Sequence, residues 1–223
     1  MLTRRRRARQ PNYLTARARA SVEVVSDNTP PWAYAQPEIH PPDPRLIEQA
    51  EAERTRLADL LGPWLTDGAV EHVGSTAVPG LAAKPIIDLM ASVRDPDAVV
   101  REAADALRAD GWHYVPPDLD RGSSWRRFYV KPDPSGQHRY AHLHLIQAGH
   151  PRWAQQLEFR DALRRDNELA DTYANLKRRL AAEHPHDREA YTEAKAAFIL
   201  AALRRNTRKT GNAGNAGNAG NAG

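Results

Sequence analysis

Apolar residues follow two periods along this chain, a strand-like period in its first two thirds and a helical period afterwards. Short apolar or alternating runs that are bounded by Gly, Pro and Asp are typical of β-strands. The runs are Ala69–Val73, Lys84–Ala91, Trp112–Val115, Trp125–Lys131 and His138–Ile146. The last two are separated by a turn-forming segment, and we expect them to pair as a hairpin.

Helical signals precede, interrupt and follow these strands. The dipeptides at residues 43–44 and 95–96 are both Asp-Pro, an N-capping carboxylate before a proline suited to a first turn, and predict helices ending near Leu61 and Asp110. Three more helices are expected from the apolar spacing of the last third: Pro151–Arg165, Leu169–Glu183 and Asp187–Arg205. The pattern therefore predicts an α+β domain with a mixed sheet, flanking helices and a C-terminal helical segment.

The two ends of the chain differ in composition from its middle. Residues 1–42 are rich in Arg and then in Pro, and residues 206–223 consist largely of Gly-Asn-Ala repeats. Such segments cannot bury a core, so we expect a disordered arm, one domain over residues 43–205 and a disordered tail. The arm also has transit-peptide composition, but we favour a solvated arm or an overextended start.

The net charge of +4 is distributed unevenly. Residues 1–19 carry seven arginines and residues 204–223 carry four basic residues, with no acidic residue in either segment. The middle of the chain keeps 21 basic and 28 acidic residues, a net charge of −7, so nucleic-acid binding is not expected. The chain has no Cys and no apolar run long enough to span a membrane. We therefore expect a soluble, cytoplasmic protein without disulfides or thiolate metal sites.

Asp88 lies inside the most apolar of the predicted strands, between Ile87 and Leu89. A buried carboxylate without a partner is strongly destabilising, so a hydrogen-bond donor or a cation should meet Asp88. At the end of the preceding strand, Gly74 and Ser75 offer backbone N–H groups and a hydroxyl to an anion. We expect a phosphate site and a carboxylate site next to each other.

A second candidate site is the segment His142-Leu143-His144-Leu145. In a strand, both imidazoles would lie on one face and both leucines on the other. If the leucines face the core, the imidazoles face a cleft, where they and Asp88 could bind a divalent transition metal. The alternative is a pair of hydrogen-bonded surface histidines. A two-histidine phosphoesterase would need a second His-x-Ser/Thr motif, which the chain lacks.

Several stretches together resemble the signature of the GrpB family. They are EHVGSTAVPGLAAKPIIDLM, RYAHLHL, FRD and YTEAKAAFI, at residues 71–90, 139–145, 159–161 and 191–199. The resemblance covers residues 43–203 and implies a nucleotidyltransferase-like fold, with Gly-Ser on one strand and Asp on the next, that handles a nucleotide or phosphate ester. The superfamily usually carries a second carboxylate where this chain has Met90, so we expect one metal ion rather than two.

The resulting hypothesis divides the candidate residues between two roles. The metal ligands and catalytic candidates are Asp88, His142 and His144. The residues expected to bind phosphate or offset its charge are Gly74, Ser75, Lys84, Arg139 and Lys195. Arg160, Asp161 and Lys177 are interpreted instead as structural ion pairs.

Two functions remain open at this stage. One is phosphoryl or nucleotidyl transfer, and the other is a non-catalytic nucleotide-binding or accessory module. The resemblance favours the second in one respect, because GrpB-like domains also occur fused to dephospho-CoA kinase. This chain itself lacks the Walker-type segment of a kinase.

Overall fold

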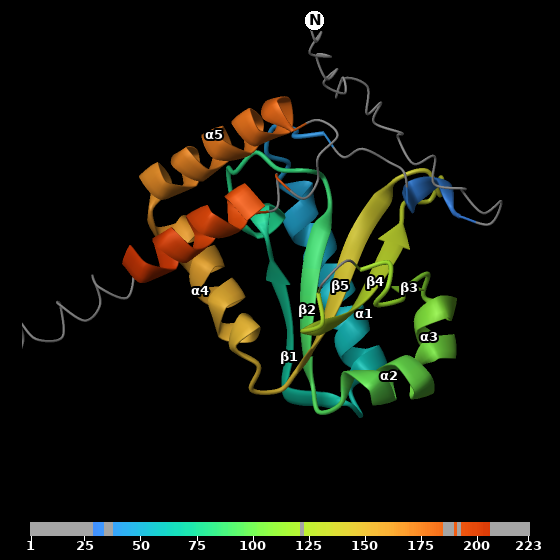
Figure 1. The fold of residues 1–223 in the computed structure, drawn as a ribbon. Coiled ribbons are helices and arrows are strands. Elements are labelled where there is room, and N and C mark those ends of the chain that lie inside the picture. The colour runs from blue at the N-terminus through green and yellow to red at the C-terminus, as the bar shows by residue number, and fades with distance from the viewer. Residues whose placement is uncertain (1–28, 34–37, 121–122, 185–189, 191–192, 206–223) are drawn as a thin grey trace, which may run out of the picture.

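A computed structural model describes residues 29–33, 38–120, 123–184, 190 and 193–205 (Figure 1). Its strands form one five-stranded sheet in the order β1-β2-β5-β4-β3. Their bounds are β1 Leu65–Val73, β2 Ile87–Val93, β3 His113–Val115, β4 Arg126–Pro132 and β5 Arg139–Gln147. Strands β2 and β5 pair in parallel and the other neighbours pair antiparallel, so the sheet is mixed and β4–β5 is the predicted hairpin.

Helices lie on both sides of this sheet. The α-helices are α1 Arg45–Leu61, α2 Pro96–Glu102, α3 Ala104–Ala109, α4 Pro151–Arg165 and α5 Asn167–Glu183, and the 3-10 helices are η1 Pro31–Ala33 and η2 Ser75–Ala77. Residues 193–205 are also helical, whereas the expected start of that helix at Asp187 lies outside the described residues. The α+β prediction, with a C-terminal helical segment, is confirmed. None of the helices in the described ranges has the length and apolarity needed to cross a bilayer.

The largest departures from the predicted boundaries are a divided helix and an extended strand. The helix expected up to Asp110 is divided at Ala103, whose φ of −100° and ψ of 5° leave the α-helical range. Strand β1 begins at Leu65, four residues earlier than expected, because Leu65 pairs with Val93 across an irregularity in the ladder. The Thr66 hydroxyl, 2.7 Å from the Ser92 hydroxyl, supports this extension.

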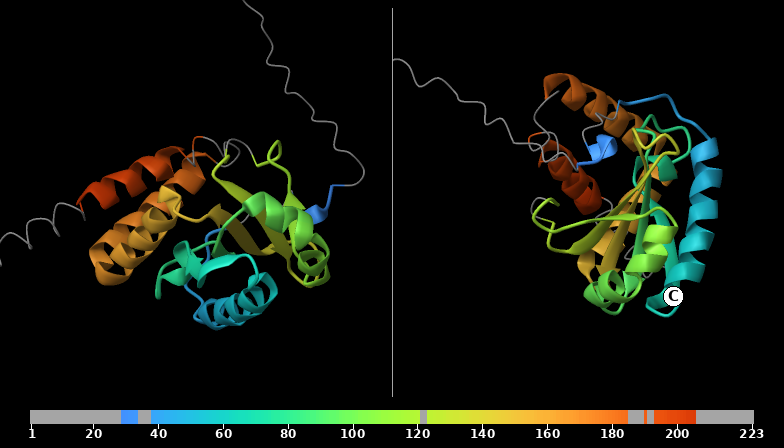
Figure 2. Two further views of the ribbon diagram at one scale, coloured as in Figure 1. Left: turned by 90° about the horizontal axis from the view of Figure 1, so that it is seen from below. Right: turned by 90° about the vertical axis from the view of Figure 1, so that its right-hand side faces the viewer.

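One face of the sheet carries the main hydrophobic core. Ile87, Leu89, Leu143 and Leu145 are fully buried there against α1, α2 and α3, and Figure 2 shows α1 lying along this face. The core holds the strands in a register that turns the intervening residues toward the opposite face. The leucines of β5 therefore face the core, as predicted.

The opposite face of the sheet is shared between helices and polar residues. Val73, Met90 and Ile146 pack against Trp153 and Leu157 of α4. Met90 is 1% exposed, so the position for which the resemblance implied a second carboxylate lies in an apolar contact. Nearer the middle of the sheet this face carries the polar cluster described below.

The packed part of the chain begins before Asp43. Trp32 of η1 is 8% exposed and packs against Phe128 and Val130 of β4. Arg139 donates hydrogen bonds to the carbonyl oxygens of Trp32 and Ala33, both at 3.2 Å. The expectation of a disordered arm is therefore wrong for Trp32 and its neighbours, because an indole in a Pro-rich segment can still bury its ring against a sheet. Residues 1–28 and 206–223 lie outside the described residues.

We expect Trp32→Ala to lower the free energy of unfolding by about 2 kcal/mol, less than for an aromatic ring enclosed in a central core. The cause is the loss of the ring's contacts with β4. Leu119→Ala is the control, because that side chain is 69% exposed and its loss should change stability by less than about 0.5 kcal/mol. Urea denaturation of both variants checks this, and equal midpoints would show that η1 does not contribute to stability.

Candidate metal and phosphate site

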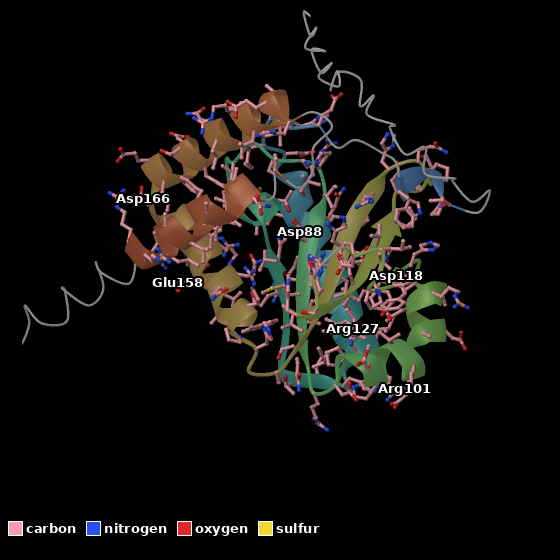
Figure 3. The ribbon with its side chains drawn as sticks, viewed as in Figure 1. Asp88, Arg101, Asp118, Arg127, Glu158 and Asp166 are labelled. Atoms are coloured by element: carbon pink, nitrogen blue, oxygen red, sulfur yellow. The ribbon has the colours of Figure 1, made fainter. Side chains whose placement is uncertain are left out.

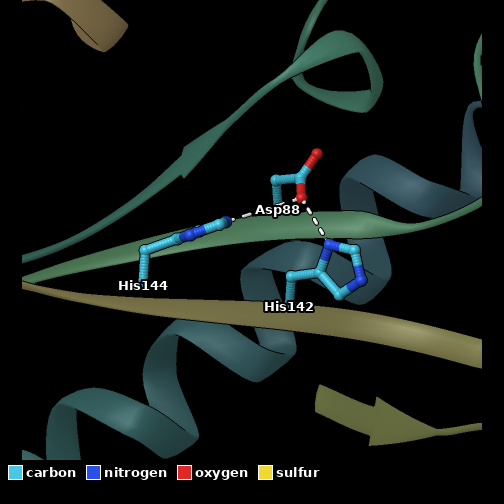
Figure 4. A group of neighbouring side chains, drawn as sticks. All are labelled: Asp88, His142 and His144. Atoms are coloured by element: carbon cyan, nitrogen blue, oxygen red, sulfur yellow. Dashed lines mark hydrogen bonds and ion pairs between the residues drawn. The ribbon is translucent and has the colours of Figure 1, made fainter. Parts of the chain in front are cut away.

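Asp88 and the two histidines come together because their strands are parallel neighbours. In the β2–β5 ladder Asp88 lies opposite His142, and Met90 lies opposite His144. Alternation sends all these side chains to the face away from the main core. Figure 4 shows both imidazoles directed from β5 toward the carboxylate on β2, and Figure 3 shows Asp88 over the middle of the sheet.

The three side chains are close enough to share one bound atom. His142 Nδ1 lies 2.9 Å from Asp88 Oδ1, and His144 Nε2 lies 3.7 Å from the same oxygen. One ligand atom from each residue lies within 4.8 Å of the others. The Asp88 side chain is 32% exposed, so solvent reaches the carboxylate while the imidazoles, at 14% and 12%, form the floor. The predicted convergence of Asp88, His142 and His144 is thus present.

The protonation states suit coordination. Burial acts to raise the pKa of Asp88, but the hydrogen bonds and charges of the two imidazoles outweigh it and hold that pKa well below its usual range. For His144, burial and the neighbouring Arg126 charge outweigh the attraction of Asp88 and lower the pKa to about 4. At neutral pH the site therefore holds a carboxylate beside a neutral His144 imidazole, and neutral imidazole is the form that binds metals.

Arg126 fixes the orientation of His144. Its guanidinium pairs with both oxygens of Asp120 at 2.9 and 2.6 Å, and its Nη1 lies 2.5 Å from His144 Nδ1. A guanidinium has no lone pair to offer, so His144 Nδ1 accepts this bond and Nε2 carries the hydrogen that points toward Asp88. The next residue of β4, Arg127, pairs instead with Asp97 of α2.

The two ring nitrogens of His142 differ in their surroundings. Because ionised Asp88 can only accept, His142 Nδ1 donates to it. The other nitrogen, Nε2, is buried and has no hydrogen-bond partner in the part of the chain that the structure describes. His142 is therefore held at the site by Asp88.

One aspartate and two imidazoles form a donor set that divalent transition metals accept. Ligation by Asp88 Oδ1, His142 Nδ1 and His144 Nε2 requires both imidazoles to carry their hydrogen on the other nitrogen. For His144 this means that the hydrogen bond from Arg126 to Nδ1 must break. The guanidinium would then stay bonded to Asp120 alone. The residues therefore fit one metal ion, provided that this contact opens.

The Gly-Ser turn lies against the carboxylate, as the sequence predicted. Gly74 has φ 71° and ψ −168°, and a Cβ at this position would lie 2.5 Å from Asp88 Oδ2. Only a glycine lets the backbone pass so close to Asp88. Ser75, the next residue, accepts a hydrogen bond from Lys177 Nζ at 2.9 Å.

The three predicted cations are placed differently from one another. The charges of Lys84 and Lys195 both lower the pKa of Lys177, which bonds to Ser75. Arg139 holds the carbonyl groups of η1 through the bonds given above, which gives it a role in attaching the N-terminal segment. A role of Lys84 and Lys195 in phosphate binding stays a prediction.

Lys177 is the functional candidate that sequence reasoning missed. Arg160 does form the predicted structural pairs, with Asp161 at 2.8 Å and Glu71 at 2.7 Å, but Lys177 binds Ser75. The signal was available in the sequence: Lys177 lies one helical turn after Tyr173 and one turn before Leu180, on a face that is otherwise apolar.

A cavity lies next to this cluster. Trp125 stacks on His144 with a centroid distance of 6.0 Å and on His150 at 6.4 Å. His150 and Arg152 line a cavity of about 290 Å³ between the start of α4 and the helix of residues 193–205. Trp125 therefore connects the imidazole floor of the site with the wall of this cavity.

Comparisons with known proteins agree with the fold and the motif. A family profile described as "GrpB protein" matches residues 36–205. A crystal structure of the "conserved protein GrpB" from Enterococcus faecalis superposes with a TM-score of 0.63 and 32% sequence identity, over 75% of this chain and 98% of that one.

Two curated relatives are longer than this chain. "UPF0157 protein YqkA" of Bacillus subtilis is 35% identical over 158 residues, which cover 71% of this chain and 43% of YqkA. A "Dephospho-CoA kinase" of Mycolicibacterium paratuberculosis is 30% identical over 192 residues, which cover 78% of this chain and 46% of that protein. The chain thus spans less than half the length of either relative.

Proposed function

This chain belongs to the GrpB family, and we propose that it handles a nucleotide or another phosphate ester with the help of one divalent metal ion. In this proposal Asp88, His142 and His144 hold the metal. Gly74 and Ser75 receive the phosphate, with the charges of Lys84 and Lys195 nearby. The fold type would be that of a nucleotidyltransferase, in which a Gly-Ser turn and an acidic strand are neighbours.

The observation that carries the proposal is the convergence of Asp88, His142 and His144 beside Gly74. The carboxylate is ionised and partly open to solvent, and the histidines present ring nitrogens to it at short distances. A metal bound there would act as a Lewis acid on a phosphoryl oxygen. This chain's own residues would orient the phosphate on the Gly-Ser turn and offset its charge with lysines.

The test is calorimetric titration of Mn²⁺ or Zn²⁺ into the wild type and into His144→Ala. We expect about one ion per chain, bound about tenfold or more weakly by the variant because it lacks one of three ligands. His138→Ala is the matched control. That imidazole also lies near a carboxylate, Asp133 at 3.5 Å, but its side chain is 73% exposed and belongs to no cluster of three potential ligands among the described residues. Equal affinities in wild type and His144→Ala would refute the metal site.

The second candidate function is an accessory module that binds a nucleotide without transforming it. Met90 favours it, because a buried methionine replaces the second carboxylate that two-metal transfer needs. The similarity to a protein named dephospho-CoA kinase favours a role near coenzyme A synthesis. A thermal-shift panel of nucleotides with Mn²⁺, followed by an assay for pyrophosphate release, separates the two functions. A ligand that raises the melting temperature without turnover supports the module.

A further inference from the structure

Lys177 is the most deeply buried cation of the described chain that no carboxylate pairs with. Only 3% of its surface is exposed. Its ammonium donates to Ser75 Oγ at 2.9 Å and to the carbonyl oxygen of Ala82 at 2.6 Å, and lies 4.9 Å from the centre of the Tyr173 ring. These groups are all neutral. Buried lysines are rarely left with neutral partners alone, because a desolvated charge is destabilising without a counter-charge.

The charges around Lys177 have the same sign as its own. Burial, and then the charges of Lys195, Arg178 and Lys84 in that order, lower the pKa of Lys177 to about 7. The three cations come from three different elements, namely the helix of residues 193–205, α5 itself and the segment before β2. These charges favour the deprotonated form of Lys177, whereas an anion at its ammonium would favour the protonated form.

Lys177 also connects helix α5 with the segment between strands β1 and β2. It lies on α5, in the helical part of the chain, but its ammonium contacts the segment between β1 and β2 at two points, Ser75 and Ala82. Ser75 follows directly on Gly74, whose backbone lies against Asp88. A ligand group bound at Ser75 and Lys177 would therefore lie next to the proposed metal ligands.

We propose that Lys177 and Ser75 form a subsite for a doubly charged oxyanion, and that Lys177 takes up a proton from solvent when this anion binds. The inference rests on the proposed function in one respect, that the anion is the phosphate end of the same substrate. Without the anion, the crowded ammonium tends to release its proton. With the anion, the opposite charge favours the protonated lysine, so binding and proton uptake are linked.

The test uses sulfate as the probe, because sulfate stays a dianion between pH 6 and pH 8 and itself takes up no proton. Calorimetric titration of the full chain in buffers of different ionisation enthalpy gives the number of protons taken up. We expect nearly one proton per sulfate at pH 8, nearly none at pH 6, and weaker binding at pH 8. His72 and His144, with pKa values lowered to about 4 chiefly by burial, stay neutral over this range. Binding at pH 8 without proton uptake would overturn the inference.

Lys177→Met and Arg178→Met form the matched pair of variants. Both remove one cation from adjacent positions of α5, but Arg178 is exposed and bonds to Asn175. We expect Lys177→Met to lose about 10- to 100-fold in sulfate affinity and all proton uptake. Arg178→Met should keep the affinity and take up a smaller fraction of a proton at pH 8, because loss of its charge raises the pKa of Lys177. Unchanged affinity in Lys177→Met would show that Lys177 only fastens α5 to the Gly-Ser turn. If Lys177→Met does not fold, the test is made with two other measurements. They are the sulfate affinity of Ser75→Ala, which should be lower than that of the wild type, and the number of protons that the wild type takes up.

Two further titrations separate this inference from the metal proposal. His144→Ala should lose metal affinity and keep sulfate binding with its proton uptake. Lys177→Met should bind Mn²⁺ like the wild type. If the wild type binds sulfate but no metal, the metal site is refuted and the anion subsite is supported. If it binds metal but no sulfate, the anion subsite is refuted and the metal site is supported.

Discussion

Gly74→Ala should cost about 2–3 kcal/mol of folding stability and weaken metal binding at the same time. The φ of 71° and ψ of −168° belong to a backbone region that is essentially restricted to glycine. The new Cβ would lie 2.5 Å from Asp88 Oδ2, so the carboxylate has to move. Its hydrogen bond to His142 would be lost or bent, and the three potential metal ligands would no longer converge.

Gly80→Ala is the control for this variant. Gly80 also has a positive φ, 75°, but a Cβ there would meet nothing within 4 Å. Gly80→Ala should lose stability only because alanine is strained at a positive φ, and it should keep full metal affinity. Urea denaturation and Mn²⁺ titration of both variants measure the two effects. Metal affinity in Gly74→Ala equal to that in Gly80→Ala would mean that Asp88 is not positioned by the Gly-Ser turn.

Local signals in the sequence were sufficient for much of the fold. Helix α4 has the predicted bounds because His150 and Pro151 begin it with a cap and a suitable first residue: the His150 side chain accepts from the backbone N–H of Arg152. The alternation of His142 to Leu145 correctly placed the imidazoles opposite the core. Both features depend on neighbours within a few residues along the chain.

The features that the sequence did not reveal depend on distant partners. The burial of Trp32 requires β4, about a hundred residues later, and the extension of β1 to Leu65 requires Val93. The pairing of Lys177 with Ser75 and of Arg126 with His144 joins separate elements. The sequence pattern shows that a polar residue lies on an apolar face, but it does not identify the distant residue that contacts it.

The same distinction applies within the site. The apolar run around Asp88 predicted that a donor would meet the carboxylate, and the His-x-His spacing predicted a shared face. Neither pattern predicted that Arg126 would donate to His144 Nδ1 and so place the ring hydrogen on Nε2, the nitrogen that faces Asp88. The guanidinium reaches His144 because β4 and β5 are antiparallel neighbours in a specific register, and such a register is decided by the packing of the whole sheet.

Lys131→Met should cost about 3–5 kcal/mol of folding stability, one of the largest effects expected in this protein. Lys131 Nζ lies 3.0 Å from carboxylate oxygens of both Glu53 on α1 and Asp110 after α3. The Glu53 side chain is 6% exposed, so removal of the ammonium leaves a buried carboxylate next to a second one. Arg56, 3.8 Å from Glu53 but 57% exposed, compensates only in part.

Two comparisons identify this buried pairing as the cause of the loss. Arg127→Met removes a cation from the same strand and the same face, but its partner Asp97 is 54% exposed, so the cost should stay below about 1 kcal/mol. In the triple variant Lys131→Met, Glu53→Gln, Asp110→Asn no uncompensated charge is left in the core, and most of the lost stability should return. Urea midpoints of the four proteins measure this. If the triple variant were as unstable as Lys131→Met, the loss would come from the contact of the lysine ammonium with the Trp112 ring, 5.4 Å from its centre, rather than from unpaired carboxylates.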